Sequence, residues 1–113
     1  MAEDREIKRH RKRFPVGFGV GKIEKNAFTD DISTEGLFIR SHVVAPPGTI
    51  IMIEIKRPEG VITLLGEVMW IKKIPPRVLH RLKGGMGIKI KSFQSGEEIY
   101  QSICDELTAR RGS

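Results

Sequence analysis

The sequence predicts an all-β protein with one C-terminal helix, folded as a small antiparallel barrel of about six strands. Three observations lead to this fold class. Apolar residues alternate with polar ones in short segments, turn residues separate the segments, and helical spacing of apolar residues occurs only near the end. Glycines within the segments favour bends that close a sheet into a barrel, which removes its exposed edges. The length of 113 residues suits one domain.

The alternation defines each strand and the face that it turns toward the core. The expected strands cover residues 14–20, 27–32, 37–40, 50–56, 61–71 and 86–90. In the fourth, Ile51, Ile53 and Ile55 share one face, as residues two apart in a strand do. In the fifth, Trp70 shares the inward face with Val68. Because no helix separates the strands, we expect them to pair as an antiparallel meander.

One helix is expected after the last strand. Ser95 followed by Glu98 has the spacing of a capping box, in which the serine hydroxyl satisfies a free amide at the start of the helix. Ile99, Ile103 and Leu107 then recur at helical spacing. We expect three parts: a flexible basic N-terminal arm, a barrel, and a helix packed on the barrel, over residues 1–13, 14–92 and 93–111.

Composition restricts the compartment and the partners. One cysteine cannot form an intramolecular disulfide, which fits a reducing compartment. No apolar segment approaches the roughly 20 residues of a membrane-spanning helix, so we expect a cytoplasmic protein. The net charge of +6 favours polyanionic partners, which include nucleotides, nucleic acids and anionic membrane surfaces.

The sequence offers no catalytic or metal-binding constellation, so we expect neither an enzyme nor a metal or cofactor site. Cys104 lies on the apolar face of the predicted helix, where a buried thiol is usually inert. Asp30 and Asp31 are adjacent on a predicted strand and should point to opposite faces, so they are not expected to share a proton.

Positive charge is concentrated in the segment 5–13, which holds six of the twenty Lys and Arg residues. Within it, Arg9 and Arg13 form an Arg-x-x-x-Arg motif that ends where the first strand begins. The planar guanidinium group matches phosphate oxygens and the O6/N7 edge of guanine. A solvated polybasic arm that binds nucleic acid or membrane without specificity explains the same charges. Arg5 and Arg9 share this spacing, but only Arg13 abuts Phe14.

A second motif, Asp31-Ile32-Ser33-Thr34-Glu35-Gly36, lies at the next expected turn. Asp and Ser side chains bond nearby backbone amides and Gly adopts positive φ, so a tight turn alone requires these residue types. As a ligand site, Asp31 would accept hydrogen bonds from the N–H groups of a base, and Ser33 would add a polar contact. Ile32 would point into the core between them.

Together the two motifs resemble the signature of the PilZ domain family, in which Arg-x-x-x-Arg precedes the first strand and Asp-x-Ser-x-x-Gly follows at the next strand turn. The resemblance extends over roughly residues 9 to 108. Four later segments also resemble family strands or turns: Gly36-Leu37-Phe38-Ile39, Pro47-Gly48-Thr49, Gly66-Glu67-Val68-Met69-Trp70-Ile71 and Gly85-Met86-Gly87-Ile88.

The resemblance implies a six-stranded PilZ-type barrel that binds the bacterial second messenger cyclic di-GMP. It implies that the first motif contacts guanines and phosphates and that the second surrounds a guanine edge, through Arg9, Arg13, Asp31, Ser33 and Gly36. Lys8 lies where family members vary in ligand stoichiometry, and a cation there favours a stacked pair of ligand molecules.

The sequence therefore predicts a stand-alone cyclic di-GMP receptor that signals to an unidentified protein effector when the ligand orders the arm. Two alternatives stay open: a small basic barrel that binds single-stranded nucleic acid, and a PilZ-like adaptor that binds only protein. The nucleic-acid alternative needs exposed aromatic residues for base stacking. Phe18, Phe38 and Trp70 all fit core positions, which weakens that alternative.

Overall fold

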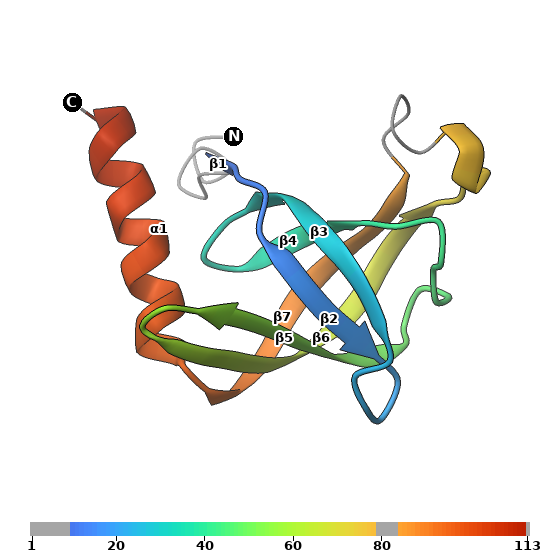
Figure 1. The fold of residues 1–113 in the computed structure, drawn as a ribbon, viewed down its shortest axis with the longest axis horizontal. Coiled ribbons are helices and arrows are strands. Elements are labelled where there is room, and N and C mark those ends of the chain that lie inside the picture. The colour runs from blue at the N-terminus through green and yellow to red at the C-terminus, as the bar shows by residue number, and fades with distance from the viewer. Residues whose placement is uncertain (1–9, 79–83, 113) are drawn as a thin grey trace.

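Six antiparallel strands close into a barrel, and one helix lies at one end of it (Figure 1). The structure is a computed structural model that describes residues 10–78 and 84–112. The barrel strands and the helix are β2 (Pro15–Gly19), β3 (Lys25–Ile32), β4 (Gly36–Arg40), β5 (Ile50–Arg57), β6 (Gly60–Lys72), β7 (Gly85–Ser95) and α1 (Glu97–Gly112). The predicted fold class, an all-β barrel with one C-terminal helix, is confirmed.

The order of the strands differs from the expected meander. Around the barrel the order is β3-β2-β5-β6-β7-β4, and β4 pairs again with β3 to close it. The chain therefore crosses over between β4 and β5, along residues 41–49, so that β4 joins β7 and β5 joins β2. All strands share the same two-residue period, so the sequence pattern locates the strands without specifying their partners.

The barrel interior is filled by residues that alternate along each strand. Ile51, Ile53 and Ile55 are buried as predicted. Trp70 is not: 47% of its side chain is exposed, and the expectation of a core position is wrong. The register of β6 against β7 shifts between Val68 and Trp70, so that Met69 is an extra residue. This bulge interrupts the alternation and turns Trp70 to the outside.

The end of the predicted arm is part of the sheet. His10 and Arg11 form β1 (His10–Arg11), which pairs antiparallel with Ile32 and Asp31 at the end of β3. The backbone N–H of Lys12 continues this pairing by donating to the Asp30 carbonyl oxygen, at 3.1 Å. Residues 10–12 of the predicted arm are thus paired with β3, and residues 1–9 lie outside the described part of the chain.

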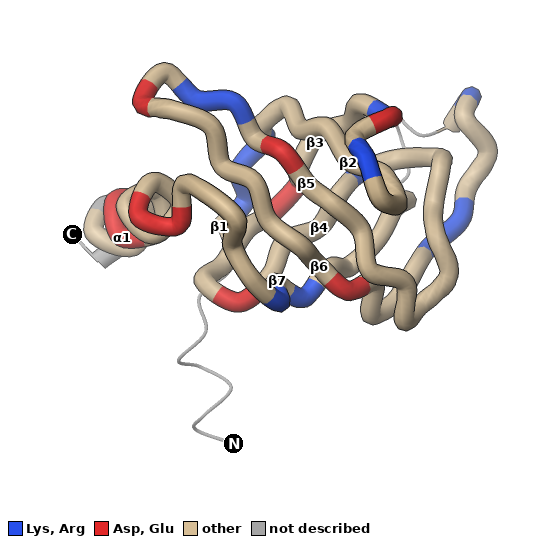
Figure 2. Tube along the Cα trace, turned by 90° about the horizontal axis from the view of Figure 1, so that it is seen from below, with Lys and Arg blue, Asp and Glu red and all other residues tan. Residues whose placement is uncertain are grey.

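Helix α1 packs its apolar side on the barrel, as its spacing predicted. Tyr100, Ile103 and Cys104 are buried in the core, and acidic residues gather elsewhere along the helix (Figure 2). The helix begins at Glu97, because β7 continues to Ser95. The Ser95 hydroxyl donates to the Val61 carbonyl oxygen at 3.2 Å.

The predicted capping box is therefore replaced by a different helix start. The Gly96 carbonyl oxygen accepts the first helical hydrogen bond, from the Tyr100 N–H at 3.0 Å, so Gly96 takes the N-cap position. Within the described part of the chain, no helix has the length and apolar character needed to cross a membrane.

Candidate functional site

Five residues on five different strands form one lateral row across the sheet. Arg11 pairs with Asp31, Asp31 with Phe38, Phe38 with Gly87, and Gly87 with Trp70. Residues that lie opposite one another in neighbouring strands point to the same face. The row therefore brings a guanidinium group, a carboxylate and two aromatic rings onto one face of the barrel.

This face is the outer one. Ile32, which follows Asp31, is fully buried in the core, and so are Leu37 and Ile39 on either side of Phe38. Because successive side chains in a strand alternate between faces, Asp31 and Phe38 point outward. The expectation that Ile32 enters the core beside an outward Asp31 agrees with this arrangement.

The aromatic end of the row is a stacked pair. The rings of Phe38 and Trp70 have centroids 5.2 Å apart and planes at 29°. Phe38 is buried beneath this contact, whereas about half of Trp70 is exposed. Gly87 makes the arrangement possible, because a Cβ there would overlap the indole of Trp70. The glycine thus leaves room for a flat aromatic surface on the outside of the barrel.

A second aromatic contact lies further along β3. The guanidinium carbon of Arg13 lies 4.4 Å from the centroid of the Phe28 ring, and 41% of Phe28 is exposed. Phe28 also lines a groove of about 480 Å³ on the outer face of the barrel. Arg40 and Lys56 add cationic groups to the lining of the groove, and Glu54 adds an anionic one.

Thr29 fixes the backbone that leads to Arg13. Its hydroxyl donates to the carbonyl oxygen of Lys12 at 2.6 Å and accepts from the N–H of Phe14 at 2.8 Å. The N–H of Thr29 in turn donates to the Phe14 carbonyl oxygen at 2.9 Å. The residues on both sides of Arg13 are thereby held against β3, and this places the guanidinium group over Phe28.

The two adjacent aspartates are separated by a register shift in β3 between Thr29 and Asp31. Asp31 lies in the lateral row beside Arg11. The Asp30 carboxylate lies 3.9 Å from the guanidinium group of Arg40. Asp30 and Asp31 therefore lie beside different arginines, Arg40 on β4 and Arg11 on β1.

The remaining residues of the second motif build the turn beneath this face. The Ser33 hydroxyl accepts from the N–H groups of Glu35 and Gly36, at 3.3 and 3.2 Å, and donates to the Gly36 carbonyl oxygen at 3.3 Å. Ser33 is only 3% exposed. A Cβ at Gly36 would overlap the Ile88 carbonyl oxygen, so this glycine lets β4 approach β7. In this structure both residues serve the turn.

The structure thus brings Arg13 and Asp31 onto one outer face and places Ser33 and Gly36 below it. Lys8 and Arg9, the other predicted ligand residues, lie outside the described part of the chain. Among the described residues, no group of three His, Cys, Asp or Glu side chains is arranged to hold a metal ion.

Three residues of this face escaped the sequence analysis. Arg11 lies between the two arginines of the first motif, where only the strand pairing reveals its proximity to Asp31. Phe28 follows the alternation as an outward residue, and its exposure could have been inferred from that period. The exposure of Trp70 could be predicted only with knowledge of the bulge in β6. Gly87 was the one residue in the sequence that pointed to it, because it leaves room for the indole.

Two comparisons with known proteins agree with this architecture. The family model described as the PilZ domain matches residues 3–103. The solved structure of the Bacillus subtilis inhibitor of motility, MotI/DgrA, superimposes with a TM-score of 0.70 at 17% identity. The match covers 94% of this chain and 50% of that one, so this chain spans half its length. No curated protein sequence matches this chain.

The structural likeness shows a shared fold, and the family match covers most of the sequence. The two motifs and the four later segments that resemble family strands or turns all lie within the matched residues. The resemblance is confirmed: the chain belongs to the PilZ domain family.

Proposed function

We propose that this PilZ domain is a receptor for cyclic di-GMP, which binds on the outer face of β1, β3 and β4. The family consists generally of non-enzymatic receptor domains for this nucleotide. The observation that carries the proposal is the lateral row from Arg11 through Asp31 to Phe38 and Trp70, with Arg13 close by on Phe28.

The chemistry of this face suits the ligand. Cyclic di-GMP has two phosphates and two guanines, and guanidinium groups recognise both phosphate oxygens and the guanine O6/N7 edge. A carboxylate such as Asp31 accepts hydrogen bonds from guanine N–H groups. The exposed rings of Phe28 and Trp70 offer surfaces on which a base can stack. Arg13 and Asp31 are the described residues that we propose as direct polar contacts to the ligand.

The other predicted residues have roles that follow from their places. Ser33 and Gly36 hold the turn that presents Asp31, and we retain contact with the ligand as a prediction for both. Arg9 would supply the second guanidinium group of the Arg-x-x-x-Arg motif, and Lys8 would favour the binding of a second ligand molecule. Because cyclic di-GMP is a messenger inside bacteria, the proposal places the domain in the cytoplasm, where its bound state would be read by a protein effector.

Calorimetric titration with cyclic di-GMP tests the proposal, because it gives affinity and stoichiometry together. We expect saturable binding by the protein, and loss of detectable binding in Arg13→Ala. Arg77→Ala is the matched control, since Arg77 is exposed on the short helix η2 (Pro76–Val78), which is not one of the strands β1, β3 and β4 that carry the proposed site. Both variants lose one positive charge. A difference in their affinity for cyclic di-GMP is therefore due to the position of the arginine and not to the net charge.

Thermal unfolding provides an independent measurement. A ligand at 100 times its dissociation constant adds about 2.7 kcal/mol to the free energy of unfolding. For a domain of this size each kcal/mol raises the melting temperature by roughly 4–8 °C. Cyclic di-GMP should therefore shift the transition clearly, whereas GTP should not. Normal binding by Arg13→Ala would show that the site has been assigned wrongly.

Single-stranded nucleic acid is a second candidate ligand, and a specific observation favours it. Trp70 and Phe28 are both exposed on a face that also carries arginines, which is the combination used to bind single strands. Titration with a short single-stranded RNA at several salt concentrations separates the two. Binding that weakens steeply with salt and exceeds that of cyclic di-GMP would favour nucleic acid. Binding of neither would leave the protein-only adaptor.

A further inference from the structure

Both segments that carry the ligand motifs are hydrogen-bonded to α1. In the first segment, Nε2 of His10 lies 3.2 Å from the Thr108 hydroxyl, near the end of the helix. In the second, the Tyr100 hydroxyl donates to the Ser33 carbonyl oxygen at 2.7 Å. These contacts join positions 98 and 67 residues apart in the sequence. One helix therefore touches the backbone or side chain of each motif segment.

Apart from its contact with α1, the segment that contains His10 is held by hydrogen bonds to β3. β1 has two residues and pairs only with β3 among the described strands. The His10 side chain is nevertheless 4% exposed, and its Nδ1 atom has no hydrogen-bond partner within the described residues. Among the described residues, the hydroxyl of Thr108 is therefore the hydrogen-bond partner of the buried His10 ring. Figure 1 shows β1 beside the C-terminal half of α1.

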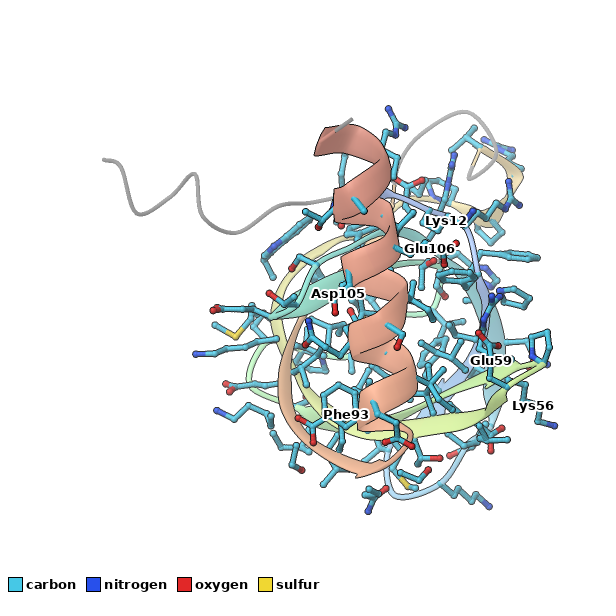
Figure 3. All side chains as sticks on the ribbon, turned by 90° about the vertical axis from the view of Figure 1, so that its left-hand side faces the viewer. Lys12, Lys56, Glu59, Phe93, Asp105 and Glu106 are labelled. Carbon is cyan, nitrogen blue, oxygen red and sulfur yellow. The ribbon has the colours of Figure 1, made fainter. Side chains whose placement is uncertain are left out.

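Glu106 of α1 lies on the same side of the helix as Lys12, which follows β1, whereas Asp105 points to the other side (Figure 3). The opposite flank, with Asp105 and Gln101, is exposed.

The turn that contains Ser33 is held in a similar way. Its amides bond to the Ser33 hydroxyl, and Ile90 N–H donates to the Glu35 carbonyl oxygen at 2.9 Å. The carbonyl oxygen of Ser33 points instead to Tyr100, which is 2% exposed. Burial raises the pKa of the Tyr100 hydroxyl well above its usual value, so the group stays protonated and remains a donor.

The helix also packs on the barrel through apolar contacts, in addition to these two hydrogen bonds. Its position is fixed by burial of Tyr100, Ile103 and Cys104 in the core, and the Tyr100 ring also packs against Phe93 with centroids 5.5 Å apart. The apolar face of α1 therefore provides a fixed support, and its hydroxyl groups reach from that support to the two motif segments.

We infer that α1 positions both halves of the proposed ligand site, with Tyr100 and Thr108 as positioning residues. The identity of the ligand in this inference rests on the proposed function. The contacts of α1 with the two motif segments are present without a ligand. A ligand that needs both motifs binds more tightly when neither must be ordered on binding. Because coupling is reciprocal, bound ligand should in turn stabilise the packing of α1 on the barrel.

The test removes each hydroxyl while keeping the shape of the side chain. Tyr100→Phe and Thr108→Val should each weaken binding of cyclic di-GMP by about 3- to 10-fold, the range expected for one hydrogen bond. Thr108→Ser keeps the hydroxyl and should bind as the unaltered protein does. Ser102→Ala removes a hydroxyl from the exposed side of the same helix and is the matched control.

Amide hydrogen exchange without ligand completes the test. Exchange at Ser33 and Gly36 should be faster in Tyr100→Phe, and exchange at His10 and Arg11 faster in Thr108→Val. If the unaltered protein binds and both variants bind equally well, the inference is overturned. If the unaltered protein does not bind cyclic di-GMP, the proposed function fails. The inference about α1 is then overturned by unchanged exchange and supported by faster exchange at these residues.

Discussion

The ring of Phe38 stacks on the indole of Trp70 with the two centroids 5.2 Å apart, although the residues belong to strands that do not pair with each other. β7 lies between those strands, and its Gly87 leaves the space that the indole occupies. The result is a flat aromatic surface beside Asp31, on the face where we propose that ligand binds.

Trp70 is the only tryptophan of the chain, so its fluorescence reports on this surface directly. We expect cyclic di-GMP to change the emission as a base stacks on the exposed indole. Trp70→Ala should weaken binding by roughly 5- to 100-fold, the range that corresponds to loss of one stacked base, and Trp70→Phe should weaken it less. Met69→Ala, an exposed neighbour, is the control. Unchanged affinity in Trp70→Ala would exclude stacking at this residue.

The turn of the second motif should prove to be a stability element as well as a part of the site. Ser33→Ala removes a buried hydroxyl that makes three hydrogen bonds, and should lower the free energy of unfolding by about 1–3 kcal/mol. Gly36→Ala places a methyl group against the Ile88 carbonyl oxygen and should also destabilise the fold. Urea unfolding measures both, with exposed Thr34→Ala as the control. Variants as stable as the unaltered protein would contradict this role.

Backbone protection at the first motif should precede ligand binding. The amides of Lys12 and Phe14 donate to the Asp30 carbonyl oxygen and the Thr29 hydroxyl, so both should exchange slowly in the free protein. Thr29→Val removes the hydroxyl, and should speed exchange at Phe14 and weaken ligand binding through Arg13. Amide exchange followed by mass spectrometry or NMR measures this, with the exposed hairpin 20–22 as the fast reference. Protection at Lys12 and Phe14 that appears only with ligand would contradict the structure.

Stability should decline in alkaline solution partly through Cys104. Burial, together with the nearby Asp105 carboxylate, raises the pKa of this thiol from about 9 to about 11. Between these values the unfolded chain loses the proton while the folded protein keeps it. The thiol therefore contributes stability that is present below about pH 9 and is lost as the pH rises toward about 11.

The variant Cys104→Ala isolates this contribution. The free energy of unfolding should fall less between pH 8 and pH 11 in the variant than in the unaltered protein. The comparison is made within each protein, so the cavity left by the missing thiol cancels to first order. An identical decline in both proteins would show that Cys104 ionises equally in the folded and unfolded states.

Much of the site's placement could not be predicted from the sequence, because it depends on which strands pair. The sequence locates Asp31 and Trp70 on two strands, but they share a face only because β4 and β7 lie between them. The strand order requires a crossover between β4 and β5 that no local pattern encodes. Ser95 likewise is a residue type that often caps helices. It lies in the sheet instead, because β7 continues to that residue and its hydroxyl donates to the Val61 carbonyl oxygen.

The sequence by itself determined the strands, the isoleucines that face inward, the apolar side of the helix and the two motifs, because each depends on residues close together in the chain. The tertiary structure alone decided that Met69 forms a bulge and exposes Trp70, that Arg11 meets Asp31, and that α1 reaches both motif segments. These relationships join residues far apart in the chain. Their geometry follows from closing the barrel and burying the helix, which no periodicity of the sequence records.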